Sequence, residues 1–283
     1  MTNSSLDFSQ RGELSLHANV VADVEAAAAS VGTQAVIVGA FARDLHLLYR
    51  HGIATQRETK DVDIALAMPD WKTFETLKAR LIESGNFRAP GAAGQRLRHR
   101  SDLPLDLVPF GHIETAERRI AWPPRGDVVM DVFGFREALA TAHRIVLPGN
   151  VHTHLISLAA LALLKLVCWQ DRHYQYPRKD AHDLNLIIRN YLIAGNEERL
   201  WNTFSAWTEE DDFDFERAGA RMLGYDMRLL LDDVGIGKVS AILSEQSNHE
   251  TPGLLPTEMS AHEPERARVL LEALLKEMLQ GER

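Results

Sequence analysis

Residues 61–68 (DVDIALAM) place two aspartates at the start of a segment whose other residues are all apolar. This composition predicts a strand buried in a sheet. Side chains at positions i and i+2 of a strand project from the same face, so Asp61 and Asp63 lie together. Like charges repel, and a carboxylate that loses its water costs free energy unless it is neutralised. The segment predicts either a solvated strand entrance, with Lys60 as a loose partner, or a site for a divalent cation.

A glycine turn and a further strand accompany this segment. Residues 34–40 (QAVIVGA) predict a buried strand that breaks at Gly39 and enters a helix over 41–50. Backbone N–H groups at the start of such a helix favour a bound phosphate. Residues 103–110 (LPLDLVPF) predict another strand, with Asp106 in the middle of its apolar run. If this strand lies beside DVDIALAM, Asp106 supplies a third carboxylate to a metal site of the phosphoryl-transfer type.

The remaining pattern predicts an α/β (α+β) domain followed by a helical domain, with a boundary near Pro148-Gly149-Asn150. The first domain covers residues 1–150 and the second covers 151–283. The further expected elements are helices over 18–31, 71–84, 154–170, 179–193 and 262–280, a connection or hairpin over 85–101, and strands over 127–133 and 143–148.

The composition, 45% hydrophobic and 25% charged, is that of a globular protein, and the net charge of −9 argues against a protein that coats nucleic acid. The single cysteine, Cys168, cannot form an internal disulfide, which favours a reducing cytoplasm. The longest apolar segment, 155–169, has 15 residues and contains Lys165, so we expect a buried helix and no membrane span.

Two groups of charged residues have more than one interpretation. Lys165 either extends to the surface or points toward an anion, which is a phosphate or a carboxylate such as the Asp180 and Asp183 pair. The arginine-rich segment 86–100 is either a solvated loop or a basic lip that contacts a nucleic-acid backbone or a nucleotide. Its arginines are Arg88, Arg96, Arg98 and Arg100.

Four motifs taken in order resemble the nucleotidyltransferase superfamily, and specifically the AbiEii/AbiGii-type nucleotidyltransferases, a family that includes toxins of type IV toxin–antitoxin systems. The motifs are VGAFARDL, RETKDVDIAL, LDLVPF and LLKLVCWQDRHYQYPRKDAHDL, which span roughly residues 34–190. The resemblance implies a nucleotidyltransferase-type mixed sheet flanked by helices as the catalytic domain. It also implies that the helical domain completes the active-site cleft.

The resemblance assigns roles to individual residues. It implies Asp61, Asp63 and Asp106 as ligands of Mg²⁺ or Mn²⁺, with Asp106 also acting as the base for the attacking hydroxyl. Lys165 and Asp180 are implied as further catalytic residues. The implied nucleotide-binding residues are Gly39, Ala40, Arg43, Thr59, Lys165 and Arg172. The family usually has Gly-Gly or Gly-Ser at the turn, so Ala40 supplies no hydroxyl to a phosphate.

The resemblance implies transfer of a nucleoside monophosphate from an NTP to an acceptor hydroxyl, with release of pyrophosphate. The acceptor is expected to be the 3′ end of an RNA such as tRNA, contacted through segment 86–100, and an antitoxin is an expected partner. A small molecule or a protein side chain is the alternative acceptor. A nucleotide-binding regulatory protein with a decayed site is the third hypothesis.

Overall fold

The computed structural model describes residues 6–55, 59–91, 94–251 and 253–280. Residues 57–58 of the RETKDVDIAL motif and residues 92–93 of segment 86–100 lie outside the described residues. The described chain forms two compact units. The first unit lies within Met1–Leu45 and Gln56–Ser157, and the second lies within His46–Thr55 and Leu158–Arg283.

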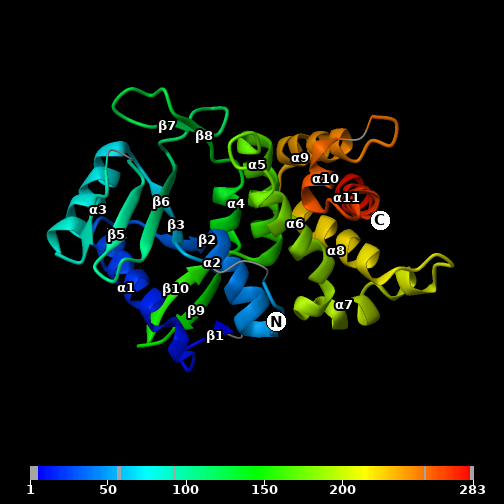
Figure 1. Ribbon diagram of the computed structural model, residues 1–283, viewed down its shortest axis with the longest axis horizontal. Helices are drawn as coiled ribbons and strands as arrows, with labels where there is room; N and C mark the ends of the chain where they lie inside the picture. The colour runs from blue at the N-terminus through cyan, green and yellow to red at the C-terminus, as the bar shows by residue number, and fades with distance from the viewer. Residues whose placement is uncertain (1–5, 56–58, 92–93, 252, 281–283) are drawn as a thin grey trace. The chain divides into compact units, whose positions relative to one another are not determined.

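In the described part of the first unit, eight strands form one mixed sheet in the order β1-β9-β10-β2-β3-β6-β5-β4 (Figure 1). The pairs β1–β9, β10–β2 and β3–β6 are parallel, and the other neighbours are antiparallel. The strands are β1 (Leu6–Asp7), β2 (Ala35–Val38), β3 (Val62–Met68), β4 (Phe87–Arg88), β5 (Arg96–His99), β6 (Pro104–Gly111), β9 (His143–Leu147) and β10 (Val151–Leu155).

The central strands β3 and β6 alternate between two faces of the sheet. One face is apolar and fully buried, and it carries Val62, Ile64, Leu66, Leu105 and Leu107. Helices α1 (Ser15–Ser30) and α3 (Trp71–Glu83) pack against each other and against the sheet. The N-terminus of α3 is capped by Asp70, whose carboxylate accepts a hydrogen bond from the Thr73 N–H at 2.7 Å. The opposite face of the two strands carries Asp63 and Asp106.

Shorter elements complete the first unit. They are a 3-10 turn (Gly12–Leu14), α2 (Gly39–Asp44), a two-stranded ribbon of β7 (Arg119–Ala121) and β8 (Val129–Asp131), and α4 (Phe135–Ala140). Helix α2 follows β2 without an intervening loop, because the chain turns at Gly39. A π-helix (Leu45–Arg50) continues directly from α2, and its residues from His46 onward belong to the second unit.

The second unit is helical. Its elements are α5 (Leu158–Arg172), α6 (Lys179–Asn190), a π-helix (Leu192–Asn196), α7 (Glu197–Asn202), a 3-10 helix (Ser205–Glu209), α8 (Phe215–Leu229), α9 (Asp233–Gln246), α10 (Leu254–Met259) and α11 (Pro264–Leu279). Helices α8 and α11 approach closely at Gly224, where a Cβ atom would overlap the carbonyl oxygen of Leu274. Among the described residues no helix combines the length and hydropathy needed to cross a membrane.

The structure confirms the predicted fold class, a mixed α/β sheet with helices followed by a helical unit. One predicted helix is wrong at its start. The helix expected over 154–170 begins at Leu158, because Val151–Leu155 pair with β9 and with β2 as strand β10. The compact units divide after Ser157, and residues 46–55 belong with the second unit.

Candidate active site

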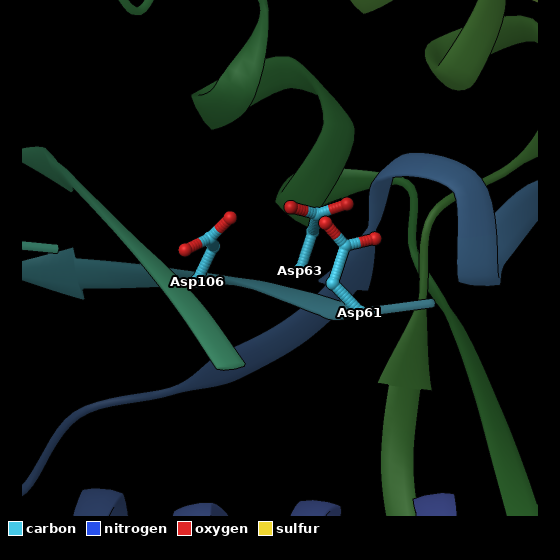
Figure 2. A group of neighbouring side chains, drawn as sticks. All are labelled: Asp61, Asp63 and Asp106. Atoms are coloured by element: carbon cyan, nitrogen blue, oxygen red, sulfur yellow. The ribbon is translucent and has the colours of Figure 1, made fainter. Parts of the chain in front are cut away.

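Three carboxylates gather at the beginning of two parallel neighbours, β3 and β6. The register places Asp63 opposite Asp106, while Asp61 precedes β3 by one residue. One carboxylate oxygen of each residue lies within 4.8 Å of the others. Figure 2 shows the three side chains projecting from the same side of the strands. We call Asp61, Asp63 and Asp106 the acidic triad.

The acidic triad suits a divalent cation by its chemistry. Carboxylate oxygens are the ligands that hard ions such as Mg²⁺ and Mn²⁺ prefer. The side chains of Asp61 and Asp106 are 26% and 17% exposed, so both retain a path to solvent. Three negative charges at this separation repel strongly unless a cation lies among them.

Gly39 brings the turn between β2 and α2 against the acidic triad. Its φ of +67° lies in the left-handed region that favours glycine. A Cβ atom at this position would overlap the Oδ2, Cγ and Cβ atoms of Asp63. The next residue, Ala40, is buried. The glycine is therefore required by the position of the Asp63 carboxylate as well as by the turn.

Arg96 of β5 contributes a cation to the acidic triad. It is the cross-strand partner of Asp106, and its guanidinium binds both oxygens of that carboxylate. Nε donates to Oδ1 at 2.7 Å and Nη2 donates to Oδ2. Nη2 also lies 3.6 Å from the Oδ2 of Asp61. The hydrogen bond with Asp106, together with the nearby charges, raises the pKa of Arg96 further above its usual value although burial opposes it.

Arg43 and Thr59 meet at a buried carboxylate, Asp44. The guanidinium of Arg43 donates to the Oδ1 of Asp44 from Nε at 2.8 Å and from Nη2 at 2.6 Å. The Thr59 hydroxyl donates to the Oδ2 of Asp44 and accepts from the Nη2 of Arg43 at 3.3 Å. Because Thr59 precedes Asp61 by two residues, this network fixes the chain entering β3 to the end of α2.

Lys165 lies in a buried ionic cluster of the second unit. Its ammonium is 3.0 Å from the Oδ1 of Asp180 and 2.6 Å from the Oδ2 of Asp183. Arg172 donates to the other oxygen of Asp180 from Nε at 3.0 Å and from Nη2 at 2.9 Å. We call these four residues the lysine cluster. Of the two anions considered for Lys165, the structure shows the carboxylate pair.

The lysine cluster holds Lys165 and Asp180 in their charged forms. Burial alone would lower the pKa of Lys165, but Asp180 and Asp183 outweigh it and raise that pKa above its usual value. Burial alone would raise the pKa of Asp180, but Lys165 and Arg172 outweigh it and lower that pKa. Burial raises the pKa of the neighbouring Cys168 thiol to about 11, although the charges of Arg172 and Lys165 oppose it. The thiol is consequently protonated near neutral pH.

The arginines of segment 86–100 have different environments. Residues 87–88 and 96–99 form the antiparallel pair β4–β5, so the hairpin alternative for this region is confirmed. Arg88 lies 2.8 Å from the carboxylate of Asp102, and Arg98 donates to the Asp102 carbonyl oxygen at 2.9 Å. Both are local contacts of a solvated hairpin, whereas Arg96 faces the acidic triad.

Two residues of the site carried no distinct signal in the sequence. Arg96 was one of several arginines in a glycine-containing segment, and only the pairing of β5 with β6 places it on Asp106. Asp44 stood beside Arg43 in a helical pattern, where an adjacent pair of opposite charges usually faces solvent. The signal that could have identified Asp44 is its position on the face shared with the apolar residues of 41–50.

Comparison with known proteins adds a family to this geometry. The sequence profile described as "Nucleotidyl transferase AbiEii toxin, Type IV TA system" matches residues 24–281. None of the curated proteins compared with the chain matches it.

Among solved structures, two of the antibiotic-resistance factor ANT(2'')-Ia are similar to the chain. One is a solution structure and the other is a crystal structure of a complex with adenylyl-2''-tobramycin. Each is 14% identical with a TM-score of 0.39 and covers 68% of this chain, and the alignments cover 95% and 97% of the respective neighbours. Because the family profile matches nearly the whole sequence, the chain belongs to the AbiEii nucleotidyl transferase toxin family of type IV toxin–antitoxin systems.

Proposed function

We propose that this nucleotidyltransferase uses Mg²⁺ or Mn²⁺ to transfer a nucleoside monophosphate from an NTP to an acceptor hydroxyl. The observation that carries the proposal is the acidic triad, whose carboxylate oxygens lie within 4.8 Å of one another at the start of β3 and β6. A structural role alone gives no reason to gather three negative charges on one sheet face. A phosphoryl-transfer site does, because its metal ions and substrate phosphates need carboxylate ligands.

Asp61, Asp63 and Asp106 would hold the metal. When bound, a divalent cation of this kind supplies positive charge that offsets the charge developing on the phosphate oxygens. The role of the protein is to fix the carboxylates in place. The ladder between β3 and β6 does so for Asp63 and Asp106, and Gly39 leaves the space that the Asp63 side chain occupies.

The proposed reaction is an in-line displacement at the α-phosphorus of the NTP. The oxygen of the acceptor hydroxyl forms a bond to this phosphorus, while the bond from phosphorus to the oxygen bridging the α- and β-phosphates breaks. Pyrophosphate leaves with the bonding electrons. The hydroxyl proton passes to the carboxylate of Asp106, which we assign as the base.

The remaining family motifs supply candidate contacts to the nucleotide. We propose that the N–H groups of Gly39 and Ala40 contact phosphate, as suits the start of a helix. Arg43 and Thr59 are assigned to the same region, where their bonds to Asp44 hold them in place. Lys165, Asp180 and Arg172 are assigned as catalytic and nucleotide-binding residues by the family motif, and the ion pairs of Lys165 and Arg172 with Asp180 hold them in place.

We propose an RNA 3′ end as the acceptor, an antitoxin as the protein partner and the cytoplasm as the location. Arg88 in segment 86–100 supports an RNA contact, since its side chain is 61% exposed while it pairs with the exposed carboxylate of Asp102. The net charge of −9 favours the alternative acceptor, a small molecule or a protein side chain.

Labelled nucleotides distinguish these acceptors. The purified chain is incubated with each α-labelled NTP, Mg²⁺ or Mn²⁺, and in turn total RNA, a small-molecule extract or a protein extract. We expect label to enter RNA in a metal-dependent reaction that also releases pyrophosphate. Label confined to small molecules or protein would establish the alternative acceptor.

The regulatory hypothesis predicts a different result in the same assay. It requires that the chain binds an NTP without turning it over, with every acceptor and with either metal. The presence of all three carboxylates of the triad, together with Lys165 and Asp180, argues against a decayed site. Absence of turnover with all four NTPs and all acceptor pools would overturn the enzymatic proposal.

A further inference from the structure

We infer that Arg96 is a built-in counter-cation that competes with the divalent metal for Asp106, so that loading the site requires Arg96 to withdraw. This inference rests on the proposed metal site at the acidic triad. It concerns a residue of β5 that would hold neither metal nor nucleotide in that proposal. Its consequence is that the affinity of the site for metal is set partly by an arginine.

The first argument is the occupancy of the Asp106 oxygens. Both accept hydrogen bonds from the same guanidinium, with Nε on Oδ1 at 2.7 Å and Nη2 on Oδ2. Bidentate pairing of this kind is among the strongest side-chain contacts because two charge-assisted bonds share one planar fork. A metal ion at Asp106 needs one of these oxygens as a ligand at ~2.1 Å, and the N–H groups of the guanidinium already point at both of them.

The second argument is charge. The Nη2 group lies 3.6 Å from the Oδ2 of Asp61 as well as on Asp106, so it is placed between two members of the acidic triad. A divalent ion bound by the acidic triad would place its positive charge in this same region. Two cations a few ångströms apart repel, and removing the arginine charge removes that repulsion.

The third argument is that Arg96 is able to leave. Its side chain is 44% exposed, whereas Lys165 in the lysine cluster is 6% exposed. Water can solvate the guanidinium once it moves away from Asp106, so the exchange leaves no buried charge without compensation. The pairing of β5 with β6 fixes the backbone of Arg96, and the side chain alone needs to change its rotamer.

Withdrawal of Arg96 also connects to the chemistry of Asp106. While both oxygens of Asp106 accept bonds from Arg96, neither is placed to take a proton from an acceptor hydroxyl. Exchange of Arg96 for metal therefore frees the carboxylate for catalysis in the same step. The arginine is a positioning residue, because it acts on Asp106 and not on the substrate.

Manganese binding to the nucleotide-free full chain tests the inference. The dissociation constant for Mn²⁺ is measured by the loss of the free-ion signal in electron paramagnetic resonance. We expect Arg96→Gln to bind Mn²⁺ at least ~10-fold more tightly than the wild type, since a unit charge has been removed beside the ion. Arg96→Lys keeps the positive charge but loses the bidentate fork, so its Mn²⁺ affinity is expected to lie between those of the wild type and Arg96→Gln.

Two controls locate the effect. Arg88→Gln removes an arginine from the adjacent strand β4, where its partner is Asp102, and is expected to leave the Mn²⁺ affinity unchanged. Adding Asp63→Asn to Arg96→Gln is expected to abolish the gain. Thermal unfolding with and without Mn²⁺ reports whether each variant is folded. Mn²⁺ should raise the unfolding temperature of Arg96→Gln more than that of the wild type.

Each remaining outcome contradicts the inference. Equal or weaker Mn²⁺ binding by folded Arg96→Gln would show that Arg96 does not compete with the metal. Tightening by Arg96→Lys to the level of Arg96→Gln would exclude competition by charge. If the wild type and every variant bind no Mn²⁺ at millimolar concentration, the proposed metal site fails and the inference fails with it. Binding that is equal in all variants would overturn the inference alone.

Discussion

At the scale of single residues, the candidate site depends on the side chain that Gly39 lacks as much as on the charged side chain of Arg96. Gly39 combines a positive φ with a position directly against Asp63, and either property alone excludes most side chains. Arg96 shows the opposite case, because a group is present instead of absent. The acidic triad attracts its positively charged guanidinium, which contacts Asp106 and Asp61. Both residues act on the carboxylates and through them on the site.

Replacement of Gly39 by alanine tests the close approach to Asp63. The Cβ atom would push the Asp63 carboxylate away from its partners, so we expect kcat/KM to fall ~100-fold or more, in line with losses from misplaced groups. The backbone strain alone is expected to cost ~1–2 kcal/mol of the free energy of unfolding. Nucleotide transfer kinetics and chemical denaturation measure the two effects.

Gly32→Ala is the matched control. Gly32 also has a positive φ, +69°, but a Cβ atom built there meets no atom within 4 Å. We expect this variant to show a similar loss of stability with nearly unchanged kcat/KM. If Gly39→Ala and Gly32→Ala had the same activity, the contact between Gly39 and Asp63 would have no role in catalysis.

At the scale of elements, the first unit places its site by strand register and the second unit anchors its charges by helix pairing. The parallel pairing of β3 with β6 brings Asp63 and Asp106 together, and the antiparallel β5 adds Arg96. Helices α5 and α6 pair Lys165 with Asp180 and Asp183, fifteen and eighteen residues further along the chain. An ionic cluster this deeply buried is stable only while all its partners are present.

The pH dependence of stability tests the lysine cluster. The lowered pKa of Asp180 stabilises the fold at pH values above the usual aspartate pKa. This stabilisation is lost as the pH falls through the folded-state pKa. The raised pKa of Lys165 stabilises the fold at pH values below the usual lysine pKa. This stabilisation is lost as the pH rises through the folded-state pKa. Both contributions are therefore complete from about pH 5 to pH 9, where we expect the cluster to contribute no slope.

Lys165→Met is expected to lower the free energy of unfolding by ~3–5 kcal/mol at pH 7, because two buried carboxylates lose their shared cation. Without Lys165, only Arg172 opposes the rise that burial causes in the pKa of Asp180. The deficit in the free energy of unfolding should therefore shrink as the pH falls toward 5. Urea titrations at several pH values measure this. Lys78→Met, which removes a pair with the largely exposed Glu75, is expected to cost ~0–1 kcal/mol. A deficit independent of pH would contradict the ionic account.

Much of this element order was predictable because each element has a local signal. The alternation of DVDIALAM and the apolar run of LPLDLVPF identify β3 and β6, and Gly39 identifies the turn. Strand β10 was missed, since HTHL alternates weakly and runs into the apolar helix α5. Its pairing with β9 and β2 is a tertiary interaction that overrides the local pattern.

At the scale of the whole molecule, the family match covers residues 24–281 and therefore includes both compact units. The sequence predicted the order of an α/β unit and a helical unit, because strand periodicity gives way to helical periodicity along the chain. It could not predict that residues 46–55 belong with the second unit. That assignment depends on contacts distant in sequence, which no local periodicity encodes.

The central claim is that the acidic triad performs nucleotide transfer, and pyrophosphate release by Asp63→Asn tests it most directly. Asp63→Asn keeps the size of the side chain and removes one negative charge of the triad. Asp102→Asn serves as the control, because its side chain is 73% exposed and pairs with Arg88. With NTP, Mg²⁺ and the acceptor pool that the wild type labels, we predict that Asp63→Asn releases pyrophosphate ~1000-fold or more slowly while Asp102→Asn matches the wild type. Release by a folded Asp63→Asn variant at the wild-type rate would contradict the account.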